Sequence, residues 1–182
     1  IDTIRRYALN DMRPAAHDAD EDSALPQPVV QKGWELGLVP SVIPEELGGF
    51  GDPLSAITGA LAAEELAYGD LALALAVMSP ALFAYPLVLY GTAEQRENLL
   101  PMFLDEQPAP ATAALLEPGI SFDPCDLKTT AAVSGSKVKL NGVKAYVPQV
   151  EAAQWMLVYA RNTESGAVEA YLVESSVPGV RV

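Results

Sequence analysis

The first part of the chain carries apolar side chains at helical spacing. In residues 1–22 they recur with a period near 3.6, which predicts an amphipathic helix with a kink at Pro14. The stretch 26–38 predicts a second helix, because prolines suit its first turn and Gly37 suits its end. Residues 39–53 hold too many prolines and glycines for regular structure.

The helical pattern resumes at 54–68 and continues to about residue 105. Asp70 is placed to cap a further helix. Thr92 and Gln95 have the spacing of a capping box for the next one. We therefore expect an all-helical N-terminal domain over residues 1–110.

Residues 71–93 contain no charged side chain. About 20 apolar residues can cross a bilayer, so a transmembrane helix is one interpretation. Pro80, Pro86 and the absence of basic flanking residues favour a buried helix of a protein core instead. We expect the buried helix and no membrane span. A membrane-associated helical protein stays the alternative, and solubility without detergent would test it.

The pattern changes to that of strands after Pro110. Asn141-Gly142 has the composition of a hairpin turn, and the continuous apolar run at 155–160 is typical of a strand buried on both faces, with 168–173 as its hairpin partner. The sequence predicts an α+β fold, with an antiparallel β domain over residues 111–182. An open sheet leaves edge groups unpaired, so we expect a further C-terminal part or a partner to complete it. Other extended stretches are expected at 111–116, 126–133 and 138–140.

Composition narrows the function. The chain carries 24 acidic and 11 basic residues, a net charge of −13, and no basic stripe for nucleic-acid binding. One cysteine, Cys125, and one histidine, His17, make no intrachain disulfide and no zinc-finger or three-histidine metal site. His17 lies in an acidic stretch typical of a solvated helix face. The single cysteine and the lack of a signal segment lead us to expect a cytoplasmic protein.

Five stretches occur in collinear order that together resemble the acyl-CoA dehydrogenases. The resemblance implies a helical domain, a middle β domain and a C-terminal four-helix domain, of which this chain would hold the first and about half of the second. On this resemblance the chain is expected to lack the C-terminal four-helix domain and to begin inside a longer protein. The stretches are Pro-Glu-Glu-Leu-Gly-Gly-Phe-Gly at 44–51, Glu-Glu-Leu-Ala at 64–67 with Gly-Asp at 69–70, Gly-Thr-Ala-Glu-Gln-Arg at 91–96, Glu-Pro-Gly at 117–119, and Leu-Asn-Gly-Val-Lys at 140–144.

The resemblance implies an FAD enzyme that desaturates an acyl-CoA thioester at Cα–Cβ. A carboxylate removes the α-proton while the β-hydrogen leaves as hydride to the flavin. The family's catalytic glutamate belongs to the C-terminal domain, so we expect no catalytic residue in this chain and interpret Glu117 as structural. The family resembles tetramers with the flavin near a subunit interface, so a homo- or hetero-oligomer is expected.

The resemblance also implies flavin contacts in two stretches that depart from the family's usual residues. The family's Thr-Glu-Pro-Gly-x-Gly-Ser-Asp corresponds to Leu-Glu-Pro-Gly-Ile-Ser-Phe-Asp at 116–123, and its Trp-Ile-Thr-Asn to Tyr-Val-Pro-Gln at 146–149. Each lost hydrogen bond weakens binding by about 0.5–1.5 kcal/mol. A non-catalytic subunit that has lost FAD and supports an active partner is therefore the alternative to an active dehydrogenase. The expected flavin contacts are Leu115, Leu116, Ser121, Phe122, Tyr146, Val147 and Pro148.

Ala74, Met78 and Leu82 share one helical face unless Pro80 interrupts it. The resemblance implies that this face lines the acyl cavity and binds substrate, together with Phe122. Ordinary core packing is the alternative for each of the three. Phe122 could equally block part of the pocket or simply pack. The apolar character of Met78 and Leu82 indicates an apolar acyl group of undefined length.

Overall fold

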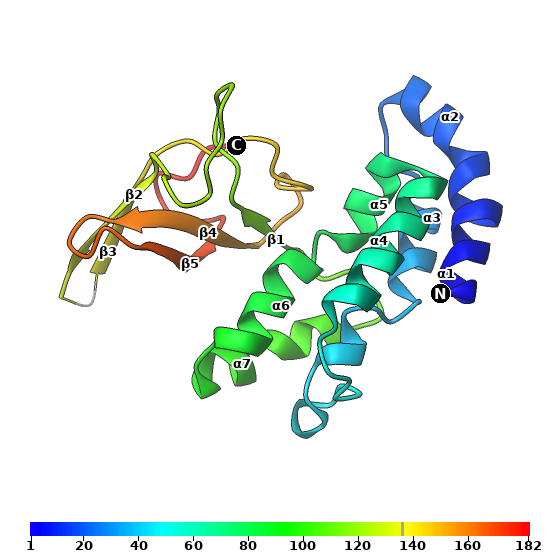
Figure 1. Ribbon diagram of the computed structural model, residues 1–182, viewed down its shortest axis with the longest axis horizontal. Coiled ribbons are helices and arrows are strands. Elements are labelled where there is room, and N and C mark those ends of the chain that lie inside the picture. Colours follow the sequence, from blue (N-terminus) through cyan, green and yellow to red (C-terminus); the bar gives the residue numbers. More distant parts are fainter. Residues whose placement is uncertain (136) are drawn as a thin grey trace. The chain divides into compact units, whose positions relative to one another are not determined.

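The computed structural model describes residues 1–135 and 137–182 (Figure 1). The chain forms two compact units. Ile1–Ala109 is helical, and Pro110–Val182 contains a five-stranded sheet. The predicted order, a helical domain followed by a β domain, is confirmed.

The helical unit begins with a long helical segment that changes its hydrogen-bonding pattern. It consists of α1 (Asp2–Tyr7), a π-helical turn (Ala8–Met12) and α2 (Arg13–Asp22). Pro14 lies in the first turn of α2 and has no N–H for the helical ladder. Where the sequence predicted a kink at Pro14, the structure has a π-helical turn that ends just before α2.

The remaining helices follow the local capping signals. The Asp70 carboxylate accepts a hydrogen bond from the Leu73 N–H at 2.8 Å, and Thr92 and Gln95 form the predicted capping box. The region 39–53 is irregular, as expected, and holds only two short 3₁₀ turns. The helices are α3 (Gln27–Trp34), α4 (Ala56–Gly69), α5 (Leu71–Met78), α6 (Ala81–Tyr90) and α7 (Ala93–Leu99), with 3₁₀ turns at Pro40–Val42, Glu45–Leu47 and Leu100–Leu104.

The Asp70 cap gives a direct test of how α5 begins. Asp70→Ala removes the acceptor for the Leu73 N–H, and we expect it to lower the free energy of unfolding of the helical unit by about 1 kcal/mol. Urea unfolding followed by circular dichroism measures the change. Asp52→Ala, at an exposed loop position, is the matched control and should leave stability unchanged. Equal losses in the two variants would contradict a capping role.

The uncharged segment forms α5 and α6, which Ser79 and Pro80 separate. Among the residues that the structure describes, Leu71–Tyr90 is the single stretch long and apolar enough to cross a membrane, by length and composition alone. Leu73 and Phe83 are almost completely buried, and 56% of the most apolar 18-residue segment of this stretch is buried within the protein. This burial is what we expect of a core helix, which passes the same test of length and composition.

The sheet is mixed, and its central strand is β4. β5 runs antiparallel along β4, and β2 pairs antiparallel with β3, whereas β1 and β2 both run parallel to β4. The prediction of an antiparallel sheet was wrong for the two parallel pairs. Parallel pairing needs a long connection, and the forty residues that separate β1 from β4 provide one. The strands are β1 (Ala111–Ala114), β2 (Thr130–Ser134), β3 (Lys137–Asn141), β4 (Trp155–Asn162) and β5 (Val168–Glu174).

Of two detailed predictions for the sheet, the buried strand at 155–160 is confirmed and the hairpin turn at 141–142 is wrong. Consecutive Met156 and Leu157 are each 5% exposed, which confirms a strand buried on both faces. The hairpin turn predicted at Asn141-Gly142 was wrong, because the β2–β3 hairpin closes between Ser134 and Lys137 and Asn141 pairs with the opposite end of β2. Gly142 is needed for another reason: a Cβ there would lie 2.5 Å from the Thr129 Oγ1.

Candidate functional site

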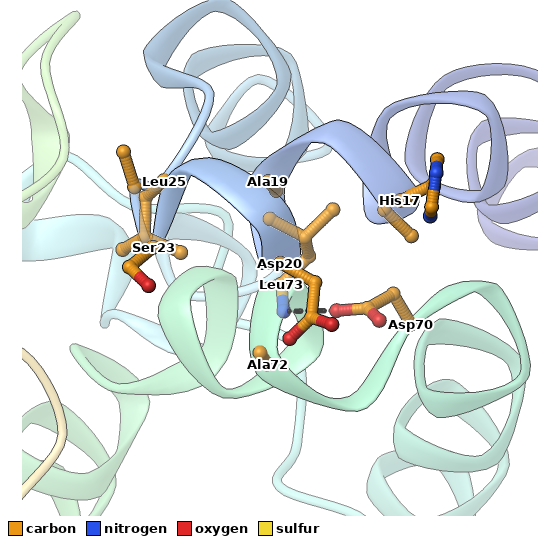
Figure 2. Close-up of a pocket in the computed structure, with 10 residues that line it drawn as sticks. His17, Ala19, Asp20, Ser23, Leu25, Asp70, Ala72 and Leu73 are labelled. Atoms are coloured by element: carbon orange, nitrogen blue, oxygen red, sulfur yellow. Dashed lines mark hydrogen bonds between the residues drawn. The ribbon is translucent and has the colours of Figure 1, made fainter.

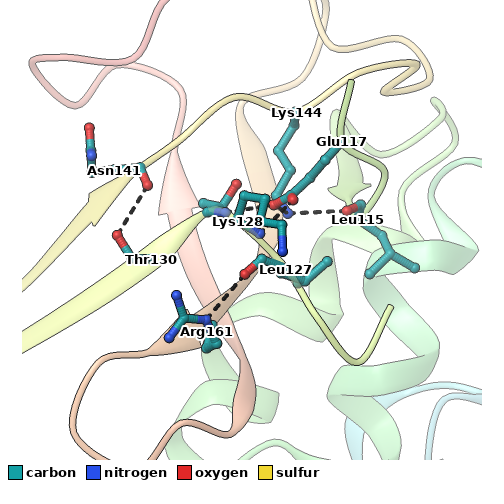
Figure 3. A network of polar contacts seen from close by, with 9 residues as sticks. Leu115, Glu117, Leu127, Lys128, Thr130, Asn141, Lys144 and Arg161 are labelled. Carbon is teal, nitrogen blue, oxygen red and sulfur yellow. Dashed lines mark hydrogen bonds and ion pairs between the residues drawn. The ribbon is translucent and has the colours of Figure 1, made fainter. Parts of the chain in front are cut away.

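A buried ion pair joins the segment after β1 to the segment after β3 (Figure 3). The Lys144 Nζ lies 2.9 Å from the Glu117 Oε1, and the two side chains are only 10% and 9% exposed. The same ammonium donates a second hydrogen bond to the carbonyl oxygen of Leu115, at 3.1 Å. Lys144 therefore holds the backbone and the carboxylate of the 115–117 segment at the same time.

The Glu117 carboxylate also accepts two hydrogen bonds from the backbone. The N–H of Lys128 donates to one oxygen at 2.7 Å, and the N–H of Thr129 donates to the other at 2.8 Å. Burial alone would raise the pKa of Glu117, but the hydrogen bonds from Lys144 and these N–H groups outweigh it and lower the pKa to about 2. The carboxylate is thus a fixed anion at neutral pH, which agrees with its interpretation as structural.

Five of the seven expected flavin contacts lie in two loops, 115–116 and 146–148, which a backbone hydrogen bond joins. The Ala145 N–H donates to the Leu116 carbonyl oxygen at 2.9 Å, so Leu115 and Leu116 lie beside the stretch 146–148. The Leu116 and Tyr146 side chains are 39% and 88% exposed. Tyr146 has a φ of +53°, in the left-handed region that a bulky side chain rarely adopts. The site therefore presents two apolar side chains on neighbouring loops.

Ser121 and Phe122 lie in the exposed loop that follows Glu117. This loop is held locally, by a hydrogen bond from the Cys125 N–H to the Asp123 carboxylate at 2.8 Å. In the part of the chain that the structure describes, no hydrogen bond joins Ser121 or Phe122 to the stretch 146–148. Their assignment as flavin contacts stays a prediction.

The expected substrate residues have different environments. Ala74 is buried in the core of the helical unit, and Met78 is partly buried against that core. Leu82 belongs to α6, beyond Pro80, and is 45% exposed. Phe122 belongs to the sheet unit. The helix break at Ser79 and Pro80 thus divides the face on which the first three were expected to lie.

A separate open hollow of about 500 Å³ lies in the helical unit, between the end of α2 and the start of α5 (Figure 2). His17, Asp20, Asp70 and Leu73 are among the residues that line it, and no predicted site residue does. The His17 side chain is 79% exposed and lies 3.4 Å from Glu21 one turn later, as expected for a solvated helix face. Across the described ranges, 1–135 and 137–182, no group of three metal-binding side chains is present.

Sequence reasoning missed the backbone donors that fix the site. Lys128 and Thr129 contribute through their N–H groups, which carry no side-chain signature. Arg161 lies nearby on β4 and donates from Nε to the Leu127 carbonyl oxygen at 3.3 Å, which helps to fix the same stretch (Figure 3). The sheet pairing that places β2 beside β4 was the missing information.

Comparison with known proteins identifies the family. Residues 1–107 match the family described as "Acyl-CoA dehydrogenase, N-terminal domain", and residues 112–182 match "Acyl-CoA dehydrogenase, middle domain". The chain belongs to the acyl-CoA dehydrogenase family. Two matches in consecutive order over nearly the whole chain confirm the resemblance that the five sequence stretches indicated.

Individual acyl-CoA dehydrogenases show the same relationship. The chain is 30% identical to cyclohexane-1-carbonyl-CoA dehydrogenase of Geobacter metallireducens, over 100% of this chain and 48% of that protein. It is 30% identical to the human mitochondrial short-chain specific acyl-CoA dehydrogenase, over 99% of this chain and 44% of that protein. A crystal structure of glutaryl-CoA dehydrogenase from Mycobacterium smegmatis in complex with FADH2 is similar, with a TM-score of 0.78 and 25% identity over 97% of this chain and 45% of that one. The chain spans about half the length of these relatives.

Proposed function

We propose that this chain forms the helical and middle-domain part of an FAD-dependent acyl-CoA dehydrogenase. The reaction is the α,β-desaturation of an acyl-CoA thioester in an oligomeric enzyme. The observation that carries the proposal is the consecutive match of both domain families along the chain. The residues of this chain bind and orient, and the base that removes the α-proton lies outside it.

The loops of the sheet unit fit the ring of a flavin by packing and by backbone donors. Leu116 and Tyr146 expose apolar surface on joined loops, and an aromatic side chain can stack on a planar ring. The N–H groups of Leu116 and Val147 donate to no acceptor within the described residues, so both are free to donate to a ligand. FAD, when bound, supplies the acceptor for the β-hydride.

Flavin binding tests this proposal directly. We expect the purified full-length protein to be yellow, with one FAD per chain and absorbance at roughly 350–500 nm. Tyr146→Ala removes the stacking surface and should weaken FAD binding about fivefold to tenfold, measured by fluorescence titration. Tyr90→Ala, at an 84% exposed tyrosine of α6, is the matched control and should not change the affinity. A full-length protein that binds no FAD would refute the proposal.

A non-catalytic subunit that supports an active partner is the second candidate. It is favoured by the lack of hydrogen-bonding groups at two positions of the joined loops, because the Leu116 side chain offers no hydroxyl and Pro148 offers neither a hydroxyl nor a backbone N–H. On this hypothesis the protein is colourless when purified alone, and the complex with its partner is yellow with flavin on the partner chains only, so with less than one FAD per chain. Spectra of both preparations distinguish the two candidates.

A further inference from the structure

Glu117 gathers three chain segments that are far apart in the sequence. Its carboxylate receives the N–H groups of Lys128 and Thr129 and the ammonium of Lys144, and its own backbone follows β1. Two of these three donors are backbone groups, so the carboxylate position is tied to the chain itself and not to flexible side chains. Three charge-assisted hydrogen bonds on one buried carboxylate make a strong and directional anchor.

The third donor, Lys144, connects this anchor to the loop 146–148. Lys144 is held by Glu117 and by the Leu115 carbonyl, and the next residue, Ala145, is held by the Leu116 carbonyl. The chain then turns into the left-handed conformation of Tyr146. Such a backbone conformation is strained for a residue other than glycine and persists only where its surroundings hold it.

Tyr146 is 88% exposed, so its own side chain contributes little to holding this conformation. The anchors on its N-terminal side, at Lys144 and Ala145, hold the backbone that leads into it. Glu117 does not reach the exposed surface, because its side chain is 9% exposed. Glu117 therefore acts on a ligand ring at Leu116 and Tyr146 indirectly, along the backbone to its neighbour Leu116 and through Lys144 to the stretch that contains Tyr146.

We propose that Glu117 is a positioning residue of the flavin site, which fixes Leu116 as its chain neighbour and Tyr146 through Lys144, at the spacing that receives the ring. This inference rests on the proposed function, since it assumes that the ligand is FAD. It assigns to Glu117 an effect on ligand affinity, beyond an effect on folding.

The test uses Glu117→Gln in the full-length protein, which keeps the shape of the side chain and removes its charge. We expect FAD to bind about tenfold more weakly, because the neutral amide holds the ammonium of Lys144 less strongly than the carboxylate does. In the flavin-free protein, the Ala145 amide should exchange its hydrogen faster, measured by hydrogen–deuterium exchange on peptides that cover 143–149. This second readout needs neither activity nor bound flavin.

Asp126→Asn is the matched control, because it also removes a carboxylate bonded to a lysine. The Lys128–Asp126 pair is 2.6 Å long, but its side chains are 78% and 63% exposed. We expect this variant to keep both the FAD affinity and the exchange rate of the wild type. The double variant Glu117→Gln with Lys144→Gln leaves no buried charge unpaired, so it serves if the single variant does not fold. Its FAD affinity is expected to be lower than that of the wild type, because both the carboxylate and the ammonium of the anchor are gone.

The outcomes separate the inference from the proposed function. A wild type that binds no FAD refutes the proposed function and the inference with it. A wild type that binds FAD, together with a Glu117→Gln protein that is less stable but binds FAD equally well, overturns the inference alone and makes Glu117 a residue of folding only. If the single variant does not fold and the double variant binds FAD as the wild type does, the inference is likewise overturned.

Discussion

Phe103→Ala is expected to lower the free energy of unfolding of the helical unit by about 3–5 kcal/mol. Phe103 lies in the 3₁₀ turn after α7 and is fully buried. Its ring packs against that of Phe83 in α6, with centroids 5.9 Å apart and planes inclined by 29°. Removing the ring leaves a cavity between α6 and the 3₁₀ turn, and the cavity can close only if one of these elements moves. Both the burial of the ring and the aromatic contact are therefore lost.

The two tryptophans allow this loss to be measured in the helical unit alone. Trp34 belongs to the helical unit and donates a hydrogen bond to the Asp105 carbonyl, whereas Trp155 belongs to the sheet unit. In a Trp155→Phe background, urea unfolding followed by fluorescence reports on Trp34. Phe50→Ala is the control, because Phe50 is 70% exposed and its truncation creates no cavity. Similar costs for the two phenylalanines would contradict this account of the core.

Lys144→Met is expected to destabilise the sheet unit by about 3–5 kcal/mol at neutral pH. The methionine retains most of the side-chain volume but leaves the buried Glu117 carboxylate without its cation. Breaking a buried ion pair from one side costs more than the pair contributes, because an uncompensated charge remains. Lys128→Met is the control, because the Lys128–Asp126 pair is exposed and should contribute nothing measurable.

The stability gap between Lys144→Met and the wild type is expected to narrow in acid. The wild-type pKa of Glu117 is lowered from 4.5 to about 2, so its contribution to stability is present above pH 4.5 and is lost as the pH falls through 2. In the variant this pKa is expected to be higher, so less stability is lost over the same interval. Urea unfolding followed by Trp155 fluorescence, from about pH 6 to about pH 2 in a Trp34→Phe background, measures the gap. A gap that is constant with pH would show that charge is not the reason for the loss.

Local signals in the sequence were sufficient for the helices. Sequence spacing alone predicts Asp70 and Thr92 as caps, and both accept the expected backbone hydrogen bonds. The hairpin of β4 and β5 followed from two adjacent apolar runs with a short polar loop between them. Capping and hairpin formation depend on residues a few positions apart, so the information lies within one stretch of chain.

The sheet and the candidate site were predicted less completely. Asn141-Gly142 has the composition of a hairpin turn, yet the strand pairing places it beyond the end of β3. The joined loops were expected only through the resemblance, and the donors that fix Glu117 were not expected at all. Their role depends on backbone N–H groups, which every residue except proline carries, so composition cannot single them out.

The sequence by itself was enough to predict the family and the order of a helical domain followed by a β domain. Only the tertiary structure decided that β1 and β2 run parallel to β4, that Pro80 divides the apolar face on which Ala74 and Leu82 were expected to lie, and that Glu117 is a buried anion. The physical reason is the range of the interactions. Periodicity and capping act between neighbours along the chain, whereas strand pairing and the burial of an ion pair depend on segments that meet only when the chain folds.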